Sequence, residues 1–179
     1  MYALANSLIV RTMTRLLCTT AIALAALLLN LAPAAAQSAS PVVGTWQTIV
    51  PATITSYQPS ASDPTTGTYQ GMGSTLWQGT WSGVTYYAIQ GTANLVNGAG
   101  SGTLRETFVG RSSSGRTGTI TFAETYVLDS GGHAEIRARV VDATGQFTGD
   151  HGSVTFVGTM LGVVTGSGIY RGTWVEPTS

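Results

Sequence analysis

Two glutamates occupy positions where a strand pattern places apolar residues. Because side chains alternate across a strand, Glu106 shares a face with Leu104 and Phe108, and Glu124 shares a face with Phe122. A buried carboxylate is costly unless it is paired, hydrogen-bonded or protonated. Two carboxyl groups close together in an apolar lumen raise the pKa of one of them, which supplies an acid and a base for proton transfer. Glu106 and Glu124 are therefore the candidate catalytic residues.

The strands that carry these glutamates are consecutive, and residues 111–117 read as the hairpin turn between them. Closing the hairpin there places Glu106 opposite Phe122. Glu124 is then the diagonal neighbour of Glu106, with roughly 7–8 Å between the Cα atoms. A register shift of two residues leaves both glutamates on the same face.

A structural role for the two glutamates is the alternative. Inward glutamates also accept hydrogen bonds and fix the register of a sheet. The partners expected for such a role are Tyr86, Tyr126, Tyr170 and Gln90. The sequence leaves both roles open.

Other chemistry-bearing residues are sparse. His133 borders a Gly-Gly turn and His151 follows Asp150, far apart and without metal-ligand spacing, so we predict surface positions and no metal site. Gly100-Ser101-Gly102 does not have the spacing of a hydrolase nucleophile turn. Phosphate-binding and dinucleotide motifs are missing as well, so the sequence predicts no cofactor.

The segments that position these residues are strands. After Gln37 no window keeps a helical period, since glycine and β-branched residues are frequent, and short alternating segments lie between turn signals. Eight strands are expected, near Val42–Ile49, Thr75–Trp81, Val84–Gly91, Gly102–Val109, Thr117–Leu128, His133–Asp142, Ser153–Met160 and Ser167–Val175. Short connections between consecutive strands predict an all-β, antiparallel, up-and-down barrel, which removes exposed edges.

A repeated tripeptide supports closure of this barrel. Gly-Thr-Trp occurs at Gly44-Thr45-Trp46, Gly79-Thr80-Trp81 and Gly172-Thr173-Trp174. Each copy places a glycine and a tryptophan on one face, which suits a tapering interior. The first and last copies fall in the first and last strands, which a closed barrel pairs; coincidence in a Gly/Thr-rich chain is the alternative.

The stretch Pro51–Thr66 contains Pro51, Pro59 and Pro64 and reads as a long irregular loop. A loop of this length in a compact domain is usually functional or disordered. We expect either a flap over one end of the barrel or a disordered segment.

One part of the chain resembles a known family. Glu106-Thr107-Phe108-Val109-Gly110 is similar to the E-x-F-x-G strand of a bacterial domain family of unknown function, and Gly118–Phe122 and Thr144–Gly149 resemble its later segments. Structures of that family are small calycin-like barrels, close in fold to allene oxide cyclase. The resemblance implies this barrel fold and no settled activity. Two departures are a glutamate at Glu124, where the family usually carries histidine, and an added strand over Gly166–Trp174.

The N-terminal residues have the layout of a secretory signal peptide. Arg11 and Arg15 precede an apolar run from Leu16 to Leu31, and Ala34-Ala35-Ala36 forms a small-residue cleavage site. Cleavage gives a signal peptide over residues 1–36 and a barrel domain over residues 37–179, secreted or periplasmic. A membrane anchor is the alternative, although the apolar run is short for a span of roughly 20 residues.

The charge of the chain limits its partners. Charged residues make up 9% of the sequence, against about 25% in typical domains. Residues 37–179 contain no lysine, six arginines and eight acidic residues, for a net charge of −2. Without a basic stripe, nucleic acid is not an expected partner, and neither is a membrane once the signal is cleaved. The oligomeric state is left open.

Three functions fit these observations. The first is binding of a small apolar molecule in the lumen, with the two glutamates as polar contacts. The wall residues expected for this role are Trp81, Tyr86, Phe108, Phe122 and Tyr126. The second is a cofactor-independent cyclase or isomerase of the allene oxide cyclase type, with Glu106 acting on a held substrate. The third is a structural or adhesive surface module, for which Tyr87 and Trp77 would begin an exterior aromatic patch.

Overall fold

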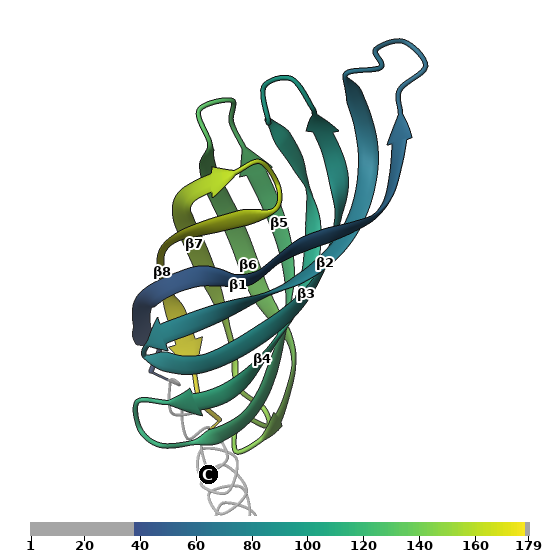
Figure 1. The fold of residues 1–179 in the computed structure, drawn as a ribbon. Coiled ribbons are helices and arrows are strands. Elements are labelled where there is room, and N and C mark those ends of the chain that lie inside the picture. Colours follow the sequence, from purple (N-terminus) through teal and green to yellow (C-terminus); the bar gives the residue numbers. More distant parts are fainter. Residues whose placement is uncertain (1–37, 178–179) are drawn as a thin grey trace, which may run out of the picture. The chain divides into compact units, whose positions relative to one another are not determined.

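The computed structural model describes residues 38–177, which form a closed antiparallel barrel of eight strands in chain order (Figure 1). The strands are β1 (Ser40–Pro59), β2 (Thr66–Gly79), β3 (Trp81–Asn94), β4 (Gly100–Ser112), β5 (Thr117–Leu128), β6 (His133–Gly145), β7 (His151–Leu161) and β8 (Thr165–Val175). The all-β class, the number of strands and the antiparallel closure are confirmed. The signal peptide expected over residues 1–36 lies outside the described residues.

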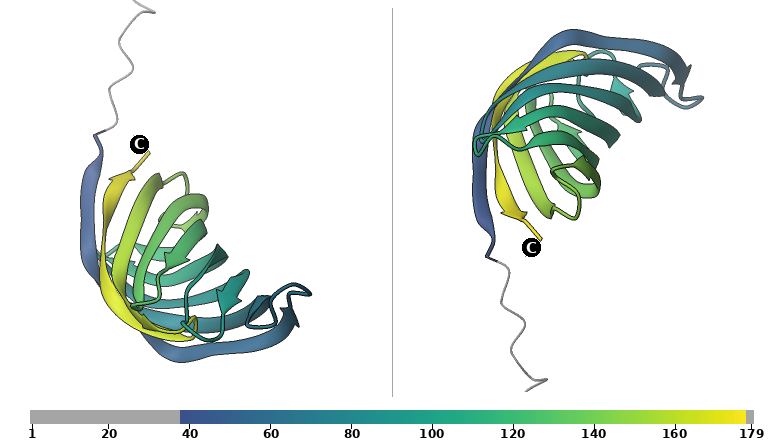
Figure 2. Two further views of the ribbon diagram at one scale, coloured as in Figure 1. Left: turned by 90° about the horizontal axis from the view of Figure 1, so that it is seen from above. Right: turned by 90° about the horizontal axis from the view of Figure 1, so that it is seen from below.

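The barrel is closed by pairing of the first strand with the last. Trp46 of β1 lies opposite Gly168 of β8, and Ser40 lies opposite Trp174. Figure 2 shows β1 beside β8 in both views along the barrel. The pairing expected from the first and last Gly-Thr-Trp copies is confirmed. The middle copy instead spans the β2–β3 turn, where Gly79 has a φ of +129°.

The prediction of a long irregular loop over residues 51–66 is wrong. β1 continues to Pro59 and β2 begins at Thr66, so only residues 60–65 connect them. The register between β1 and β2 shifts on both sides of Pro51, and β1 has already left β8 at that point. Because the bulges interrupt the regular pairing of β1 with β2 around Pro51, the strand tolerates the missing proline N–H.

Two apolar clusters fill the barrel. We call the end with the β2–β3, β4–β5 and β6–β7 turns the lower end, and the opposite end the upper end. The lower cluster contains Trp77, Trp81, Phe108, Ile120, Phe122, Phe147, Phe156, Tyr170 and Trp174, among others. The upper cluster contains Ala52, Tyr69, Tyr87, Ile89, Ala93 and Tyr126. Aromatic rings of the lower cluster pack closely around Trp77, with centroid distances of 4.9–6.0 Å.

The β6–β7 loop closes the lower end. Phe147 from this loop is fully buried, and the guanidinium of Arg116 lies 5.2 Å from the centre of its ring. Asp150, also buried, accepts hydrogen bonds from Arg116 at 2.7 Å and from the indole N–H of Trp174 at 2.8 Å. A buried ion pair with these additional hydrogen bonds fixes the loop against the barrel wall.

The outer face carries few charges and mixes polar side chains with exposed apolar ones such as Met72, Val127 and Ile169. Arg137 and Arg139 are exposed, as expected for the solvated face of β6, and His133 and His151 are exposed near turns. No helix long and apolar enough to cross a membrane occurs in residues 38–177.

Candidate functional site

The two glutamates meet inside the barrel on β4 and β5. Glu106 lies opposite Phe122 and Glu124 lies opposite Leu104, which confirms the register predicted for this hairpin. Their exposed fractions are 5% and 4%. Strand alternation therefore places both carboxyl groups in the lumen, at the boundary between the lower and the upper cluster.

Glu106 is held by hydroxyl groups from β2 and β3. The hydroxyls of Thr75 and Thr85 both lie within hydrogen-bond distance of its Oε1, Thr75 at 3.0 Å. Thr75 also accepts the indole N–H of Trp77 at 3.0 Å. Hydrogen bonds that donate to a carboxylate favour its charged form, so this environment suits Glu106 as the anion of the pair.

Glu124 has a different environment. Its carboxyl lies beside that of Glu106 in the lumen, and its Oε1 has no hydrogen-bond partner within the described residues. Burial and the neighbouring charge of Glu106 raise the pKa of Glu124 well above its usual range. Burial raises the pKa of Glu106 too, and the threonine hydroxyls oppose that shift. Because Glu106 has the threonine donors and the pKa of Glu124 is raised well above its usual range, Glu124 is the member of the pair suited to hold a proton.

A cavity lies directly above the glutamate pair. Its wall is mostly apolar and is formed by Trp46, Trp77, Ile89, Leu104, Tyr126, Ile136 and Phe156. The polar groups on it are few and include Glu106, Glu124, Thr48 and Thr75. The free volume is about 40 Å³, which is room for about three water molecules. An enclosed apolar space with a few converging polar groups is the usual form of a small-molecule site.

The β7–β8 turn covers this cavity from the upper end. Val163 of the turn lines the cavity, and the carbonyl of Val164 accepts the N–H of Ala52 at 2.8 Å. Thr48 accepts the N–H of Gly166 at 2.9 Å. The turn is thus attached to the middle of β1, and access to the cavity from above depends on these contacts.

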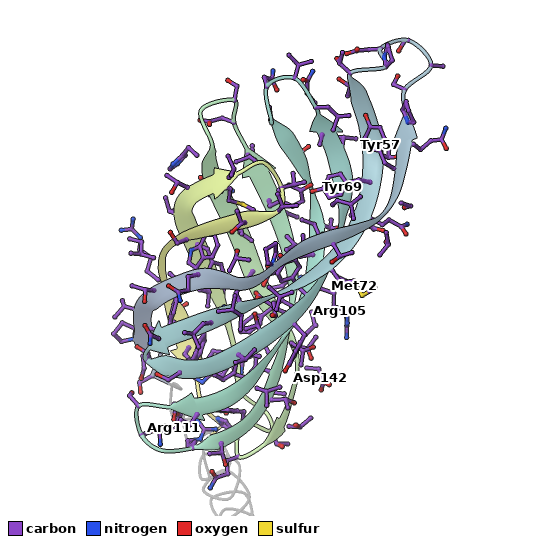
Figure 3. The ribbon with its side chains drawn as sticks, in the orientation of Figure 1. Tyr57, Tyr69, Met72, Arg105, Arg111 and Asp142 are labelled. Atoms are coloured by element: carbon purple, nitrogen blue, oxygen red, sulfur yellow. The ribbon has the colours of Figure 1, made fainter. Side chains whose placement is uncertain are left out.

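Tyrosines from β2, β3 and β5 form the region above the glutamates. The hydroxyls of Tyr69 and Tyr126 are hydrogen-bonded to each other. Burial and the charge of Glu106 raise the pKa of Tyr87 to about 12. Figure 3 shows Tyr57 and Tyr69 in the upper part of the barrel, whereas Met72 and Arg105 lie on its outside. The tyrosines near the cavity stay neutral in the neutral pH range.

The residues expected from the sequence to form the cavity wall fall into three groups: one lines the cavity, three are packed in the lower cluster, and one is exposed. Tyr126 lines the cavity. Trp81, Phe108 and Phe122 face the lumen but belong to the packed lower cluster and do not line the cavity. The placement of Tyr86 in the lumen is wrong, because this side chain is 62% exposed.

The prediction of an exterior aromatic patch around Tyr87 and Trp77 is wrong as well. These side chains are only 8% and 1% exposed. Trp81 begins β3, so the inward parity runs from Trp81 through Thr85 to Tyr87. Counting from the buried tryptophan would have selected the correct tyrosine.

The hydrogen-bond partners of Glu106 also differ from those expected from the sequence. Of the partners expected from the sequence, Tyr86 and Gln90 are exposed, Tyr126 pairs with Tyr69, and Tyr170 bonds the backbone of Trp81. The actual donors, Thr75 and Thr85, carry no distinctive signal in a threonine-rich chain. Within residues 38–177, no group of three or more His, Cys, Asp or Glu side chains is placed to hold a metal ion.

The comparison with known proteins shows a similarity of fold only. A protein of unknown function from the DUF3224 family of Shewanella oneidensis MR-1 is similar with a TM-score of 0.59 and 12% sequence identity, over 79% of this chain and 100% of that chain. No family model and no curated protein matches the sequence. At this identity the likeness concerns the barrel fold alone. The more specific resemblance to calycin-like and allene oxide cyclase barrels stays a prediction.

Proposed function

We propose that the protein binds a small, mostly apolar molecule in the cavity above Glu106 and Glu124. The observation that supports this most directly is the Oε1 atom of Glu124, which is buried on the cavity wall without a hydrogen-bond partner. A buried polar atom without a partner costs free energy, and a ligand that supplies the partner recovers it.

The cavity size suggests the size of the ligand. The free volume holds about three water molecules, so a ligand of about five non-hydrogen atoms also requires side chains of the wall to move apart. Apolar walls supply the affinity for such a molecule, and the carboxyl pair fixes its orientation.

The four tryptophans of the chain provide a direct test, because each indole N–H gives its own NMR signal. Trp46 and Trp77 line the cavity, whereas Trp81 and Trp174 belong to the lower cluster only. The ¹⁵N-labelled protein is titrated with isobutanol and, separately, with isobutylammonium chloride. We expect at least one of them to shift the Trp46 and Trp77 signals saturably while the Trp81 and Trp174 signals move little. If neither probe gives a saturable shift at Trp46 and Trp77, the proposed function is overturned.

A second candidate function is proton transfer in a cyclase or isomerase of the allene oxide cyclase type. The observation that favours it is the asymmetry of the carboxyl pair, in which Glu106 accepts from two threonine hydroxyls and is suited to act as base, while Glu124 is suited to act as acid. In an isomerisation, Glu106 would remove a proton from one carbon of the substrate and Glu124 would deliver one to another.

Butanone in D₂O tests this second function, since it has five non-hydrogen atoms and acidic C–H bonds next to a carbonyl. Under this proposal the wild-type protein speeds deuterium incorporation into butanone, and Glu106→Gln loses that effect. Equal rates with wild type, the variant and buffer alone would rule out base catalysis of this kind.

We propose in addition that the protein is secreted or periplasmic. Arg11 and Arg15, the apolar run that follows them and the site Ala34-Ala35-Ala36 support this. N-terminal sequencing of the protein from its host is expected to begin at Gln37. An intact N-terminus would contradict the proposal.

A further inference from the structure

We infer that the cavity selects a small organic cation, a protonated aliphatic amine, over a neutral molecule of the same shape. This inference names the ligand class and rests on the proposed function. The charges around the cavity, its aromatic wall and the unpartnered carboxyl oxygen of Glu124 support it.

The charge on the cavity wall is of one sign. Glu106 and Glu124 both line the cavity, and no arginine or histidine is among the described residues that do. Of the arginines in the described part of the chain, Arg105, Arg111, Arg137, Arg139 and Arg171 are exposed. Arg116 is engaged with Asp150 and Glu176 at the lower end. No cation of the described residues compensates the charge of Glu106, so a positively charged ligand would supply the missing counter-charge.

The rest of the wall suits a cation as well. Five aromatic side chains line the cavity, namely Trp46, Trp77, Tyr87, Tyr126 and Phe156. The faces of such rings attract ammonium groups, and a desolvated site strengthens that attraction. A wall of tryptophan and tyrosine beside carboxylates is therefore better matched to an ammonium group than to an anion.

The unpartnered oxygen gives the cation a place to bind. An ammonium group has three donors and no acceptor, which fits the Oε1 of Glu124. Trp46 also has a buried N–H without a partner, but a Cβ on Gly168 would lie only 2.8 Å from that nitrogen, so the N–H lies against the β8 wall. The carboxyl pair is thus the polar contact that a ligand in the cavity completes.

Binding of the cation changes the protonation of the pair. In the empty cavity Glu124 holds a proton. With an ammonium group beside them, both can ionise, and the proton leaves to the solvent. The other titratable groups that face the pair are Tyr87 from β3 and Tyr126 from β5, both with pKa values raised by burial. Cation affinity is therefore expected to increase from pH 5 to pH 8.

The experiment compares isobutylammonium with isobutanol, which have the same carbon skeleton and differ in charge. Dissociation constants come from the Trp46 and Trp77 indole signals at pH 7. We expect isobutylammonium to bind at least ten-fold more tightly, and its affinity to increase with pH while that of isobutanol stays constant. If isobutanol binds equally well or better, the ligand class is wrong and the proposed function stands. If neither binds, both are wrong.

Two matched variants connect the preference to the carboxyl pair. Glu106→Gln removes the carboxylate that the threonines support, and Glu124→Gln removes the proton donor but leaves that carboxylate in place. We expect Glu106→Gln to abolish the preference for isobutylammonium while isobutanol still binds. Glu124→Gln should keep a preference for the cation and show a weaker dependence on pH than wild type. Retained preference and pH dependence in Glu106→Gln would overturn the inference, with near-UV circular dichroism showing that the variant is folded.

Discussion

Glu106 lies within reach of two threonine hydroxyls and Glu124 of none, although the two carboxyl groups lie in the same lumen on adjacent strands. Because of this asymmetry, two chemically identical side chains differ in their protonation state. Glu106 has the donors that an anion needs, and Glu124 holds the proton. The predictions below test this asymmetry, the cavity above it and the closed end below it.

Replacing Glu124 by Gln is expected to stabilise the protein above acidic pH. Burial raises the pKa of both glutamates in the folded state. The folded protein then binds more protons than the unfolded chain, so wild-type stability is highest below the unfolded pKa and falls as the pH rises toward the raised folded pKa. At pH 8, Glu124→Gln should increase the free energy of unfolding by at least about 1 kcal/mol. At pH 4 the two proteins should be nearly equal.

Urea unfolding at both pH values measures this difference. The exposed Glu135 on β6 provides the control, because its ion pair with Arg137 lies on the surface. Glu135→Gln is expected to change stability by less than about 0.5 kcal/mol at either pH. A Glu124→Gln variant that is less stable than wild type at pH 8 would show that the pair does not carry the unfavourable buried charge argued here.

Thr85→Val tests the support of Glu106. Valine keeps the shape of threonine but cannot donate to the carboxylate, so the pKa of Glu106 should rise further and the affinity for isobutylammonium should fall about five-fold or more. NMR titration of the ¹³C-labelled carboxyl groups follows the pKa directly. Thr107→Val is the matched control, since Thr107 pairs with Thr121 and not with Glu106. Equal titration curves in both variants would show that Thr85 does not stabilise the Glu106 carboxylate.

Val163→Trp is expected to fill the cavity. Val163 lies in the β7–β8 turn and is only partly buried, so a larger side chain has room at the turn itself. Binding of both probes at Trp46 and Trp77 should be lost, with a change in stability of about 1 kcal/mol. Val127→Trp, at an exposed position of β5, should leave binding unchanged. Normal binding in Val163→Trp would mean that ligands reach the glutamates by another route.

Asp150→Ala is expected to open the lower end without affecting the cavity. The substitution leaves the Arg116 guanidinium and the Trp174 indole without their buried partner, which should cost about 3 kcal/mol. Glu176→Ala removes only the exposed partner of Arg116 and should cost less than about 1 kcal/mol. Thermal unfolding gives both values. Loss of probe binding in a folded Asp150→Ala protein would contradict the independence of the two ends.

The sequence was sufficient to predict the register of the glutamate hairpin. It was not sufficient to predict which side chains surround the two carboxyl groups. Glu106 opposite Phe122 follows from one turn and one alternating pattern, both local. The contact with Thr75 depends on the registers of three strands together, and a threonine-rich chain offers many equivalent hydroxyls. No local pattern selects the two that reach Glu106.

The errors in side-chain placement have a common cause. A strand boundary shifted by one residue exchanges the two faces, which placed Tyr86 inside and Tyr87 outside. Pro51 was read as a loop residue because the sequence does not show that β1 pairs on one side only at that point. The small cavity volume depends on how all eight strands pack, and no segment of the sequence encodes it alone.

The seam between β1 and β8 determines when the cavity can exist. Strands β1 to β7 can pair in sequence as each emerges from the ribosome, but β1 has to wait for β8 with one edge unpaired. Met160 and Val163, which belong to the last hairpin, reach the cavity wall only when that hairpin docks. Contacts between distant parts of a chain form slowly. A chain that ends before β8 would therefore have two open strand edges and lack the part of the cavity wall that the last hairpin supplies.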